Sequence, residues 1–360
     1  MVKALVTGGT GFVGSHVVRT LLDGGHTVRV LHRTTSKLDA LAGLTYESAL
    51  GDVLEEEALR AACTGCDWVF HVAAVADYWQ ADQSHLFAIN VEGTRRVLRA
   101  AREAGVRRVI FTSSAAAVGF GEDRQPADET IDFSLSPHEF PYGYSKLKAE
   151  EVARYAVREY GQDIVTVNPV IVLGPGDLNL ISGRFITEMQ RLQWTIPVSS
   201  GGIGVVDVRD VARWHVLAAE RGRTGERYIL GTANYSLRDW YALCAQVVGV
   251  AAPFLTLPDF VLPYAASTIE ALQKAGIQLP VDASQTRLGS RKIHFDSHKT
   301  HRELGPPQFD MYTSLEDTYT WYRDHGYLHD DALARFIAVL GRWLGVPGSD
   351  PKRRPAPEHT

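Results

Sequence analysis

Short apolar runs alternate along the chain with longer segments in which apolar residues recur at helical spacing. Residues 2–7 form an apolar run that ends at glycines, and residues 12–24 repeat apolar positions with the period of a helix. The same alternation predicts strands at 27–32, 68–74, 108–113 and 164–167, and helices at 55–62, 91–104 and 145–160. Strands and helices that alternate in this way form βαβ units, so the sequence predicts a parallel sheet with helices on both faces.

The regular alternation of strand and helix patterns ends after residue 173. Helices are predicted at 183–193, 208–221, 236–248, 260–275 and 315–322, with short strands such as 227–230 between them. We therefore expect an α/β fold, with a Rossmann-type doubly wound parallel sheet in residues 1–173 and a smaller, mostly C-terminal α/β lobe in residues 174–345 whose strands return to the sheet. A predicted helix at 330–344 has one apolar face, which suits docking onto the body or an oligomer contact. The proline-rich residues 346–360 are expected to be a disordered tail.

Charge and composition exclude several classes of protein. The chain has 37 lysines and arginines against 42 aspartates and glutamates, a net charge of −5, whereas nucleic-acid binding requires a basic surface. Three cysteines in 360 residues cannot form a disulfide framework, so we expect a reducing, cytoplasmic location. No apolar run approaches the roughly 20 residues that span a bilayer, residues 1–20 lack the features of a signal peptide, and the histidines show no metal-ligand spacing. We expect no nucleic-acid or membrane partner and no metal.

A glycine-rich loop lies directly between the first predicted strand and the first predicted helix. It reads Thr7-Gly8-Gly9-Thr10-Gly11-Phe12-Val13-Gly14. Gly8 allows a tight turn, Gly11 lets the backbone approach a pyrophosphate, and Gly14 allows close packing of helix and strand. Because the free N–H groups at the start of the helix would face the anion, the loop predicts a dinucleotide site.

The spacing G-x-x-G-x-x-G resembles the phosphate-binding loop of the extended short-chain dehydrogenase/reductase superfamily, the NAD-dependent epimerase/dehydratase family. The resemblance covers about residues 2–328, and further family motifs follow in order: Gly51-Asp52-Val53, His71-Val72-Ala73-Ala74, Asn90-Val91-Glu92-Gly93-Thr94, Thr112-Ser113-Ser114-Ala115, Tyr142-Gly143-Tyr144-Ser145-Lys146 and Asn168-Pro169. It implies that Asp52 and Val53 flank the adenine, and that Ala73 and Ala74 pass close to the ribose and nicotinamide. The glycine loop and the family motifs together imply these cofactor-binding residues: Thr7, Gly8, Thr10, Gly11, Phe12, Val13, Gly14, Asp52, Val53, Ala73, Ala74, Asn90, Thr112, Asn168 and Pro169.

The end of the second predicted strand indicates which dinucleotide binds. NAD enzymes usually place a carboxylate there to bind the ribose 2′-hydroxyl, but residues 31–37 read Leu-His-Arg-Thr-Thr-Ser-Lys and contain no acid. Arg33 can form a planar, charge-assisted contact with a 2′-phosphate, and Lys37 can add a donor. We therefore expect NADP(H) in preference to NAD(H). The alternative is that Arg33 is solvated, or stacks on the adenine of either cofactor.

Candidate catalytic residues follow the fifth predicted strand and begin the helix after it. Tyr142 and Lys146 are four residues apart, so a helix places both on one face, where Lys146 can stabilise a phenolate. In the family the serine directly before the alanine is catalytic, which selects Ser114 as the hydrogen-bond donor to the substrate oxygen. Tyr144 and Lys148 share the spacing but lie about 200° further around the helix, and they lack the serine that the family places before its catalytic lysine. The resemblance therefore implies Ser114, Tyr142 and Lys146.

Two departures from family patterns narrow the reaction. Ser114-Ala115-Ala116 stands where the family's dehydratases carry Thr-Asp-Glu. Ile203-Gly204 stands where sugar-nucleotide epimerases carry Arg-Asp, which removes a diphosphate clamp that Arg184 or Arg209 could replace. The chain looks more like the dihydroflavonol reductase/cinnamoyl-CoA reductase branch. That branch implies an NADPH-dependent oxidoreductase that reduces an aldehyde or ketone, with an NDP-sugar epimerase or a 3β-hydroxysteroid dehydrogenase-like enzyme as alternatives.

The expected partner is a small carbonyl or alcohol substrate, bound by the lobe of residues 174–345. Tyr78 and Trp79 follow the fourth predicted strand, where they would form an aromatic wall for an apolar substrate or simply pack beneath the loop. Family members often dimerise through the helices that carry residues 90–102 and 142–155. The resemblance therefore leaves a homodimer open.

Overall fold

The computed structural model describes residues 1–76, 82–121, 125–180, 183–192, 198–253, 255–274, 286 and 289–328. The helix predicted at 330–344 and the tail predicted at 346–360 lie outside these residues. The chain divides into two compact units, and each is described by itself.

The first unit comprises residues 1–172, 204–233 and 294–309. Its centre is a seven-stranded sheet whose paired strands are all parallel, in the order β3-β2-β1-β4-β5-β6-β9. The strands are β1 Lys3–Thr7, β2 Thr27–His32, β3 Glu47–Leu50, β4 Trp68–His71, β5 Arg108–Thr112, β6 Ile164–Pro169 and β9 Arg227–Leu230. The order reverses between β1 and β4, which is the switch point of a doubly wound sheet. The predicted Rossmann-type α/β fold is confirmed.

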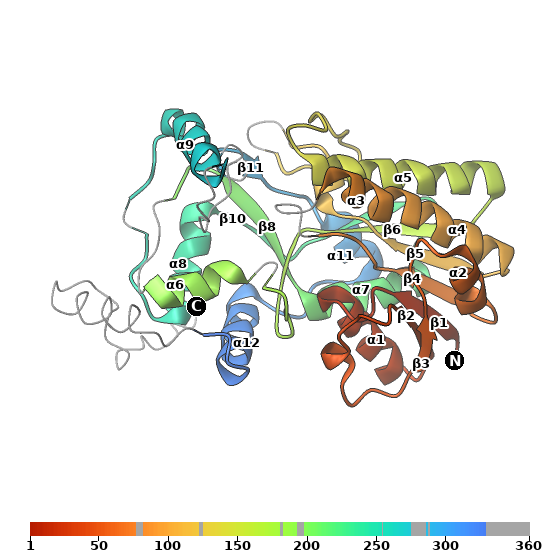
Figure 1. Ribbon diagram of the computed structural model, residues 1–360. Helices are drawn as coiled ribbons and strands as arrows, with labels where there is room; N and C mark the ends of the chain where they lie inside the picture. Colours follow the sequence, from red (N-terminus) through yellow and green to blue (C-terminus); the bar gives the residue numbers. More distant parts are fainter. Residues whose placement is uncertain are drawn as a thin grey trace. The chain divides into compact units, whose positions relative to one another are not determined.

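Helices cover both faces of this sheet (Figure 1). Helices α2, α4 and α5 pack side by side over one face, and α1, α7 and α11 cover the other. Their bounds are α1 Phe12–Asp23, α2 Glu56–Cys63, α4 Thr94–Glu103, α5 Pro141–Tyr160, α7 Val208–Arg221 and α11 His298–Leu304. A short helix α3, Gln83–Phe87, and a π-helical turn η2, Ala88–Gly93, lead into α4. The helix predicted at 145–160 begins four residues earlier, because Pro141 suits the first helical position, where no N–H is needed.

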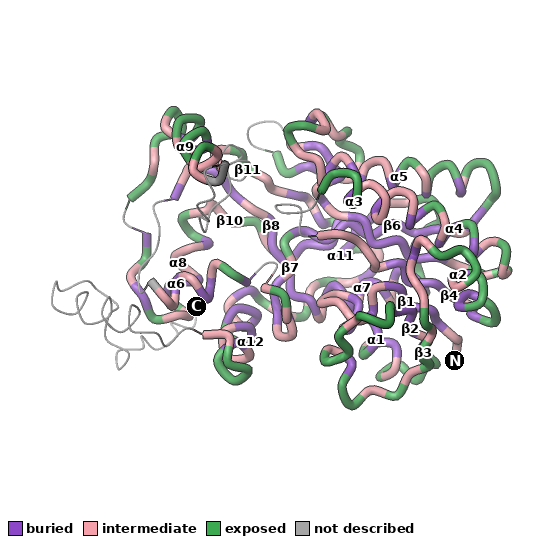
Figure 2. Tube along the Cα trace, viewed as in Figure 1, coloured by how far each residue is buried: buried purple, intermediate pink, exposed green. Residues whose placement is uncertain are grey.

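The core lies between the sheet and its helices. The central strands β1, β4, β5 and β6 are buried along most of their length (Figure 2), as their apolar runs predict for a sheet covered on both faces. Ala149, Ala153 and Ala156 form the buried face of α5 against the core. Small side chains allow α5 to lie close to the sheet, which brings the start of this helix near the ends of β4, β5 and β6.

The second unit comprises residues 173–203, 234–293 and 310–360. Its described helices are α6 Arg184–Leu192, α8 Leu237–Val248, α9 Leu262–Lys274 and α12 Met311–Asp324, with short 3-10 turns such as η4 Asp259–Val261. Helix α12 begins four residues before the predicted start because the Asp310 carboxylate accepts hydrogen bonds from the N–H and hydroxyl of Thr313. The expected smaller, mostly C-terminal α/β lobe is therefore present.

A second, four-stranded sheet has the order β10-β8-β11, and β7 also pairs with β8. Its strands are β7 Ile171–Leu173, β8 Gly202–Asp207, β10 Ala233–Ser236 and β11 Lys292–Ile293. Among the described residues, no helix is long and apolar enough to cross a membrane.

Candidate active site

The glycine-rich loop forms a tight turn between β1 and α1. Gly8 has φ +72°, and a Cβ at this position would lie 2.6 Å from the backbone nitrogen of Ala73 in the loop after β4. A Cβ on Gly14 would lie 2.1 Å from the carbonyl oxygen of Gly8. Real Cβ atoms do not approach so closely, so both positions require glycine. The loop is thereby held against the end of β4, where a dinucleotide would cross the sheet.

The start of α1 suits an anion. Its N-cap residue is Gly11, which has no side chain to satisfy the first N–H groups of the helix. The amide of Gly11 donates to Gly8 O at 3.0 Å, which closes the turn and leaves Phe12 and Val13 to begin the helix. Backbone donors and the positive end of the helix dipole then fit a pyrophosphate, so these residues suit the predicted dinucleotide.

Thr7 and His71 join the ends of β1 and β4 beneath this loop. Thr7 Oγ1 and His71 Nδ1 are 2.8 Å apart, and His71 Nε2 lies 3.0 Å from Thr94 Oγ1. Burial, reinforced by the charge of Lys146, lowers the pKa of His71 to about 3, so its ring is neutral at ordinary pH. The Thr7 hydroxyl also accepts a long hydrogen bond from Ala73 N, 3.4 Å away. These contacts give Thr7 a role in joining the strands.

The end of β2 presents cations to solvent. His32 is buried and bonds Ser48 Oγ at 2.7 Å and the carbonyl of Arg33 at 3.1 Å, which fixes the backbone at this strand end. The amide of Arg33 donates to Ser36 Oγ at 3.1 Å and closes a turn. The side chains of Arg33 and Lys37 are exposed. A 2′-phosphate at this end of the sheet would therefore find one cation at the start of the turn and a second just after it.

Asp52, Val53 and Asn90 shape the neighbouring loops. The Asp52 carboxylate accepts from Leu54 N at 2.9 Å, and Val53 is buried. Asn90 is buried in the π-helical turn, where it pairs with the backbone N–H and C=O of Val75 and donates to Ser145 Oγ at 3.0 Å. Asn90 thus ties the loop after β4 to the start of α5. Ala73 and Ala74 lie on that loop, and Tyr78 and Trp79 lie outside the described residues.

Ser114, Tyr142 and Lys146 meet where β5 ends and α5 begins. Lys146 is 2% exposed, and its Nζ donates to Thr112 O at 2.9 Å. Burial lowers the pKa of Lys146 to about 8, against the opposing charge of Glu150. Burial raises the pKa of the Tyr142 phenol, and a hydrogen bond with the Ser114 side chain acts in the opposite direction. The cluster therefore holds a protonated phenol beside a hydroxyl, one helical turn from a buried amine.

The second tyrosine–lysine pair on α5 has other partners. Lys148 Nζ bonds both carboxylate oxygens of Glu151, at 2.9 and 2.8 Å, and lies 5.3 Å from the centre of the Tyr144 ring. Tyr144 packs against Phe87 and Phe133. Within the described part of the chain, neither Tyr144 nor Lys148 bonds Ser114.

Thr112 and Asn168 use their side chains within the protein. Thr112 Oγ1 lies 2.8 Å from Nε2 of the buried His215, whose pKa burial lowers to about 4. Asn168 Nδ2 donates to Ser114 O at 2.9 Å and to Glu150 Oε1 at 2.6 Å. Its Oδ1 is buried and has no hydrogen-bond partner in the described structure. Pro169 follows at the end of β6.

The sequence analysis did not single out Glu150, Ser113 or His215. Glu150 is the one that local sequence could have indicated, because it extends the four-residue spacing of Tyr142 and Lys146 and is charged beside the buried Ala149. The partners of Ser113 and His215 come from distant parts of the chain and leave no local signal. Among the described residues, no group of three or more histidine, cysteine, aspartate or glutamate side chains could hold a metal ion.

Known proteins resemble this chain over most of its length. The Synechocystis protein named "Putative dihydroflavonol 4-reductase" is 39% identical over 330 residues, which are 90% of this chain and 95% of the relative. Cinnamoyl-CoA reductase 1 of Petunia hybrida is 33% identical over 280 residues, 73% of this chain and 80% of the relative. The solved structure of PA4631, a nucleoside-diphosphate-sugar epimerase from Pseudomonas aeruginosa, matches with a TM-score of 0.76 and 27% identity, and covers 91% of this chain and 99% of that one.

The family model for the NAD dependent epimerase/dehydratase family matches residues 4–231. The match begins in β1 and ends just after β9, so it includes the glycine loop and all three candidate catalytic residues. The resemblance found in the sequence, including that to the dihydroflavonol reductase and cinnamoyl-CoA reductase branch, is confirmed. The chain therefore belongs to the NAD-dependent epimerase/dehydratase family of extended short-chain dehydrogenases/reductases.

Proposed function

We propose that this protein is an NADPH-dependent reductase of an aldehyde or ketone, with Ser114, Tyr142 and Lys146 as its catalytic residues. The observation that carries the proposal is the contact between the Ser114 side chain and a Tyr142 phenol whose pKa burial raises. The phenol is protonated at neutral pH, as a proton donor requires, and the Ser114 hydrogen bond opposes the rise in its pKa, which favours release of the proton. The similarity to reductases over nearly the whole chain supports the same direction of chemistry.

Each side chain has a separate task in a reduction. The bound nicotinamide would supply the hydride that reaches the carbonyl carbon. Tyr142 gives its proton to the oxygen as negative charge develops there, and the Ser114 hydroxyl donates a second hydrogen bond to that oxygen. The Lys146 ammonium, fixed by Thr112 O at 2.9 Å, stabilises the phenolate left behind. The negative charge left on Tyr142 is therefore stabilised by a cation that is already in place.

The preference for NADPH rests on the end of β2. Arg33 and Lys37 are exposed in the segment that follows β2, and no acidic side chain occurs between residues 31 and 37 to repel a phosphate. An arginine that meets a phosphate with two parallel hydrogen bonds recognises charge and shape together. NADH lacks the 2′-phosphate and would not form this contact.

The test is a panel of aldehydes and ketones incubated with NADPH and, separately, with NADH, followed by the loss of reduced-nicotinamide absorbance. The proposal expects stoichiometric NADPH consumption with at least one carbonyl and a clear preference for NADPH. Tyr142→Phe should lose turnover but keep NADPH binding. Tyr144→Phe, two residues further along the helix and on another face, should keep both. Turnover by Tyr142→Phe at the wild-type rate would exclude Tyr142 as the proton donor.

An NDP-sugar epimerase is the second candidate, favoured by the similarity to the Pseudomonas aeruginosa epimerase. Arg209, one of the two arginines that could hold a diphosphate, binds Asp207 through Nε and Nη2, at 2.9 and 2.8 Å, and lies 3.6 Å over the ring of Phe309. A diphosphate would have to compete with that carboxylate, which argues against this role. An epimerase would interconvert NDP-sugars with no net change in nicotinamide absorbance, so the same assay separates the two candidates.

A further inference from the structure

Glu150 places a carboxylate in the interior, one helical turn beyond Lys146. The residue is 1% exposed, and Tyr142, Lys146 and Glu150 follow one another at intervals of four along α5. Residues at this spacing share a face of the helix, so Glu150 continues the face that carries the catalytic side chains. Burying a carboxylate is costly unless donors surround it. The groups around the Glu150 carboxylate must therefore supply these donors.

Four donors bind the Glu150 carboxylate. Oε1 accepts from Ser113 Oγ and from Asn168 Nδ2, both at 2.6 Å. Oε2 accepts from Arg227 Nη1 at 3.1 Å and from Arg154 Nη1 at 3.3 Å. The two oxygens thus face different groups: Oε1 binds residues at the ends of β5 and β6, and Oε2 binds two cations.

Both donors on Oε1 belong to residues that hold Ser114 in place. Ser113 is the residue before it, and the Ser113 amide also donates to Val167 O at 2.8 Å. Asn168 uses the same amide nitrogen to bind Glu150 and the Ser114 carbonyl, the latter at 2.9 Å. The backbone at Ser114 is therefore held from the preceding residue and from its own carbonyl, and both restraints end on one carboxylate.

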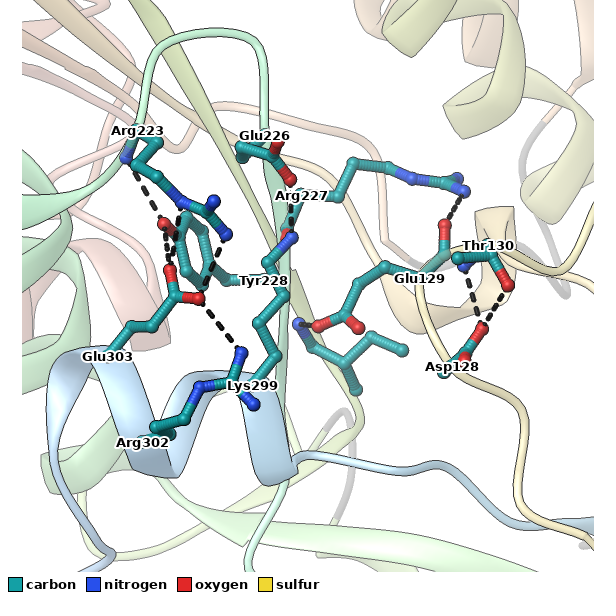
Figure 3. A network of polar contacts seen from close by, with 11 residues as sticks. Asp128, Glu129, Thr130, Arg223, Glu226, Arg227, Tyr228, Lys299, Arg302 and Glu303 are labelled. Atoms are coloured by element: carbon teal, nitrogen blue, oxygen red, sulfur yellow. Dashed lines mark hydrogen bonds and ion pairs between the residues drawn. The ribbon is translucent and has the colours of Figure 1, made fainter.

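Arg227 holds Glu150 from the opposite side. It lies on β9, and its side chain is 17% exposed, against 47% for Arg154. Its second terminal nitrogen donates to the carbonyl of Glu129, toward which the side chain extends in Figure 3. The Glu129 carboxylate in turn accepts from Ile229 N at 2.9 Å. The loop before α5 thus fixes Arg227, and Arg227 in turn fixes the Glu150 carboxylate.

The charge of Glu150 also acts on Lys146. It raises the pKa of that amine while burial lowers it to about 8. The other groups near Lys146 are Tyr142 on the same helix, the neutral His71 from β4, and the carbonyl of Thr112 from β5. Glu150 is the acidic side chain among them, so replacing it with a neutral one should lower the fraction of Lys146 that carries a charge.

We propose that Glu150 is a positioning residue of the active site: braced by Arg227, it fixes Ser114 against Tyr142 through Ser113 and Asn168. The donors on Oε1 are the residue before Ser114 and the amide that binds the Ser114 carbonyl, so the carboxylate that joins β9 to α5 also restrains Ser114. The proposal rests on the proposed function, because it assigns Glu150 a part in the reduction for which Ser114 and Tyr142 are the catalytic residues.

The experiment compares Glu150→Gln and Glu150→Asp with a matched control, Glu151→Gln. The Glu151 side chain is 45% exposed, and within the described part of the chain its carboxylate binds only Lys148. With a carbonyl that the wild type reduces, Glu150→Gln should lower kcat about 100-fold, since a displacement of about 1 Å at a reacting group costs this much, and should leave KM and the NADPH Kd within about threefold. The alkaline limb of its pH profile should move to lower pH. Glu151→Gln should match the wild type.

Glu150→Asp separates position from charge. It keeps the carboxylate but withdraws it from Ser113 and Asn168, so kcat should fall while the alkaline limb stays in place. It also carries the test if Glu150→Gln does not fold. A kcat within about threefold of the wild type in whichever of the two variants folds would overturn the proposal.

Hydrogen exchange gives a readout that needs no substrate. In Glu150→Gln, or in Glu150→Asp if the first variant does not fold, the amides of residues 113–118 should exchange about tenfold faster than in the wild type and in Glu151→Gln, because their anchor is weakened. If the wild type reduces no carbonyl, the proposed function fails while this measurement still tests the anchoring of Ser114. Unchanged exchange in this segment would refute the anchoring even if kcat fell.

Discussion

Acidification should destabilise the protein through His71, because its imidazole is completely buried between two threonines. Nδ1 lies 2.8 Å from Thr7 Oγ1 and Nε2 lies 3.0 Å from Thr94 Oγ1, so the neutral ring satisfies both neighbours. The pKa of His71 is lowered from 6.5 to about 3, first by burial and then by the charge of Lys146. The unfolded chain therefore binds a proton at a pH where the folded protein does not.

The sign and size of the effect follow from that difference. Stability is fully present above pH 6.5 and is lost as the pH falls toward the folded-state pKa of about 3. One pKa unit corresponds to about 1.4 kcal/mol. Lowering the pH from neutral to about 5 should therefore cost roughly 2 kcal/mol at this one residue, before most carboxylates begin to titrate.

Urea unfolding followed by intrinsic fluorescence between about pH 7 and pH 5 measures this loss. His71→Gln keeps a donor and an acceptor for the two threonines but cannot take up a proton. It should therefore lose roughly 2 kcal/mol less than the wild type over this interval. His85→Gln, which removes an exposed histidine on α3, is the control and should keep the wild-type slope. Equal slopes for His71→Gln and the wild type would refute the reasoning.

Three further predictions concern the site. Reduction should fall about tenfold per pH unit above about pH 8, because Lys146 then loses the charge that stabilises the phenolate, and a kcat profile that stays flat to pH 10 would contradict this. Arg33→Ala should lower kcat/KM for NADPH at least about tenfold and leave that for NADH unchanged, as parallel assays with the two cofactors would reveal. Gly14→Ala should destabilise the protein by about 3 kcal/mol and abolish NADPH binding in a fluorescence titration, because the new Cβ would lie 2.1 Å from Gly8 O; binding at wild-type affinity would contradict that geometry.

Local sequence patterns were sufficient to predict most strands of the first unit. The strands β1, β2, β4, β5 and β6 coincide with predicted apolar runs, because a strand that is covered on both faces must be apolar at nearly every position. The glycine loop was equally evident, since the steric demands at Gly8 and Gly14 arise within a single turn. The four-residue spacing of Tyr142 and Lys146 was readable because helical geometry alone places them on one face.

The tertiary structure decided which distant residues share the site. Strand β9 joins the sheet beside β6, and this brings Arg227 to Glu150, a residue 77 positions earlier. The pairing of β5 with β6 sets Thr112 opposite Val167, so that Ser113 and Ser114 emerge next to Asn168. Such neighbours depend on strand order and register, which are determined by packing over the whole sheet. The local sequence, with its family motifs, could therefore indicate the candidate catalytic side chains, whereas the groups that hold them in place became visible only once the sheet was assembled.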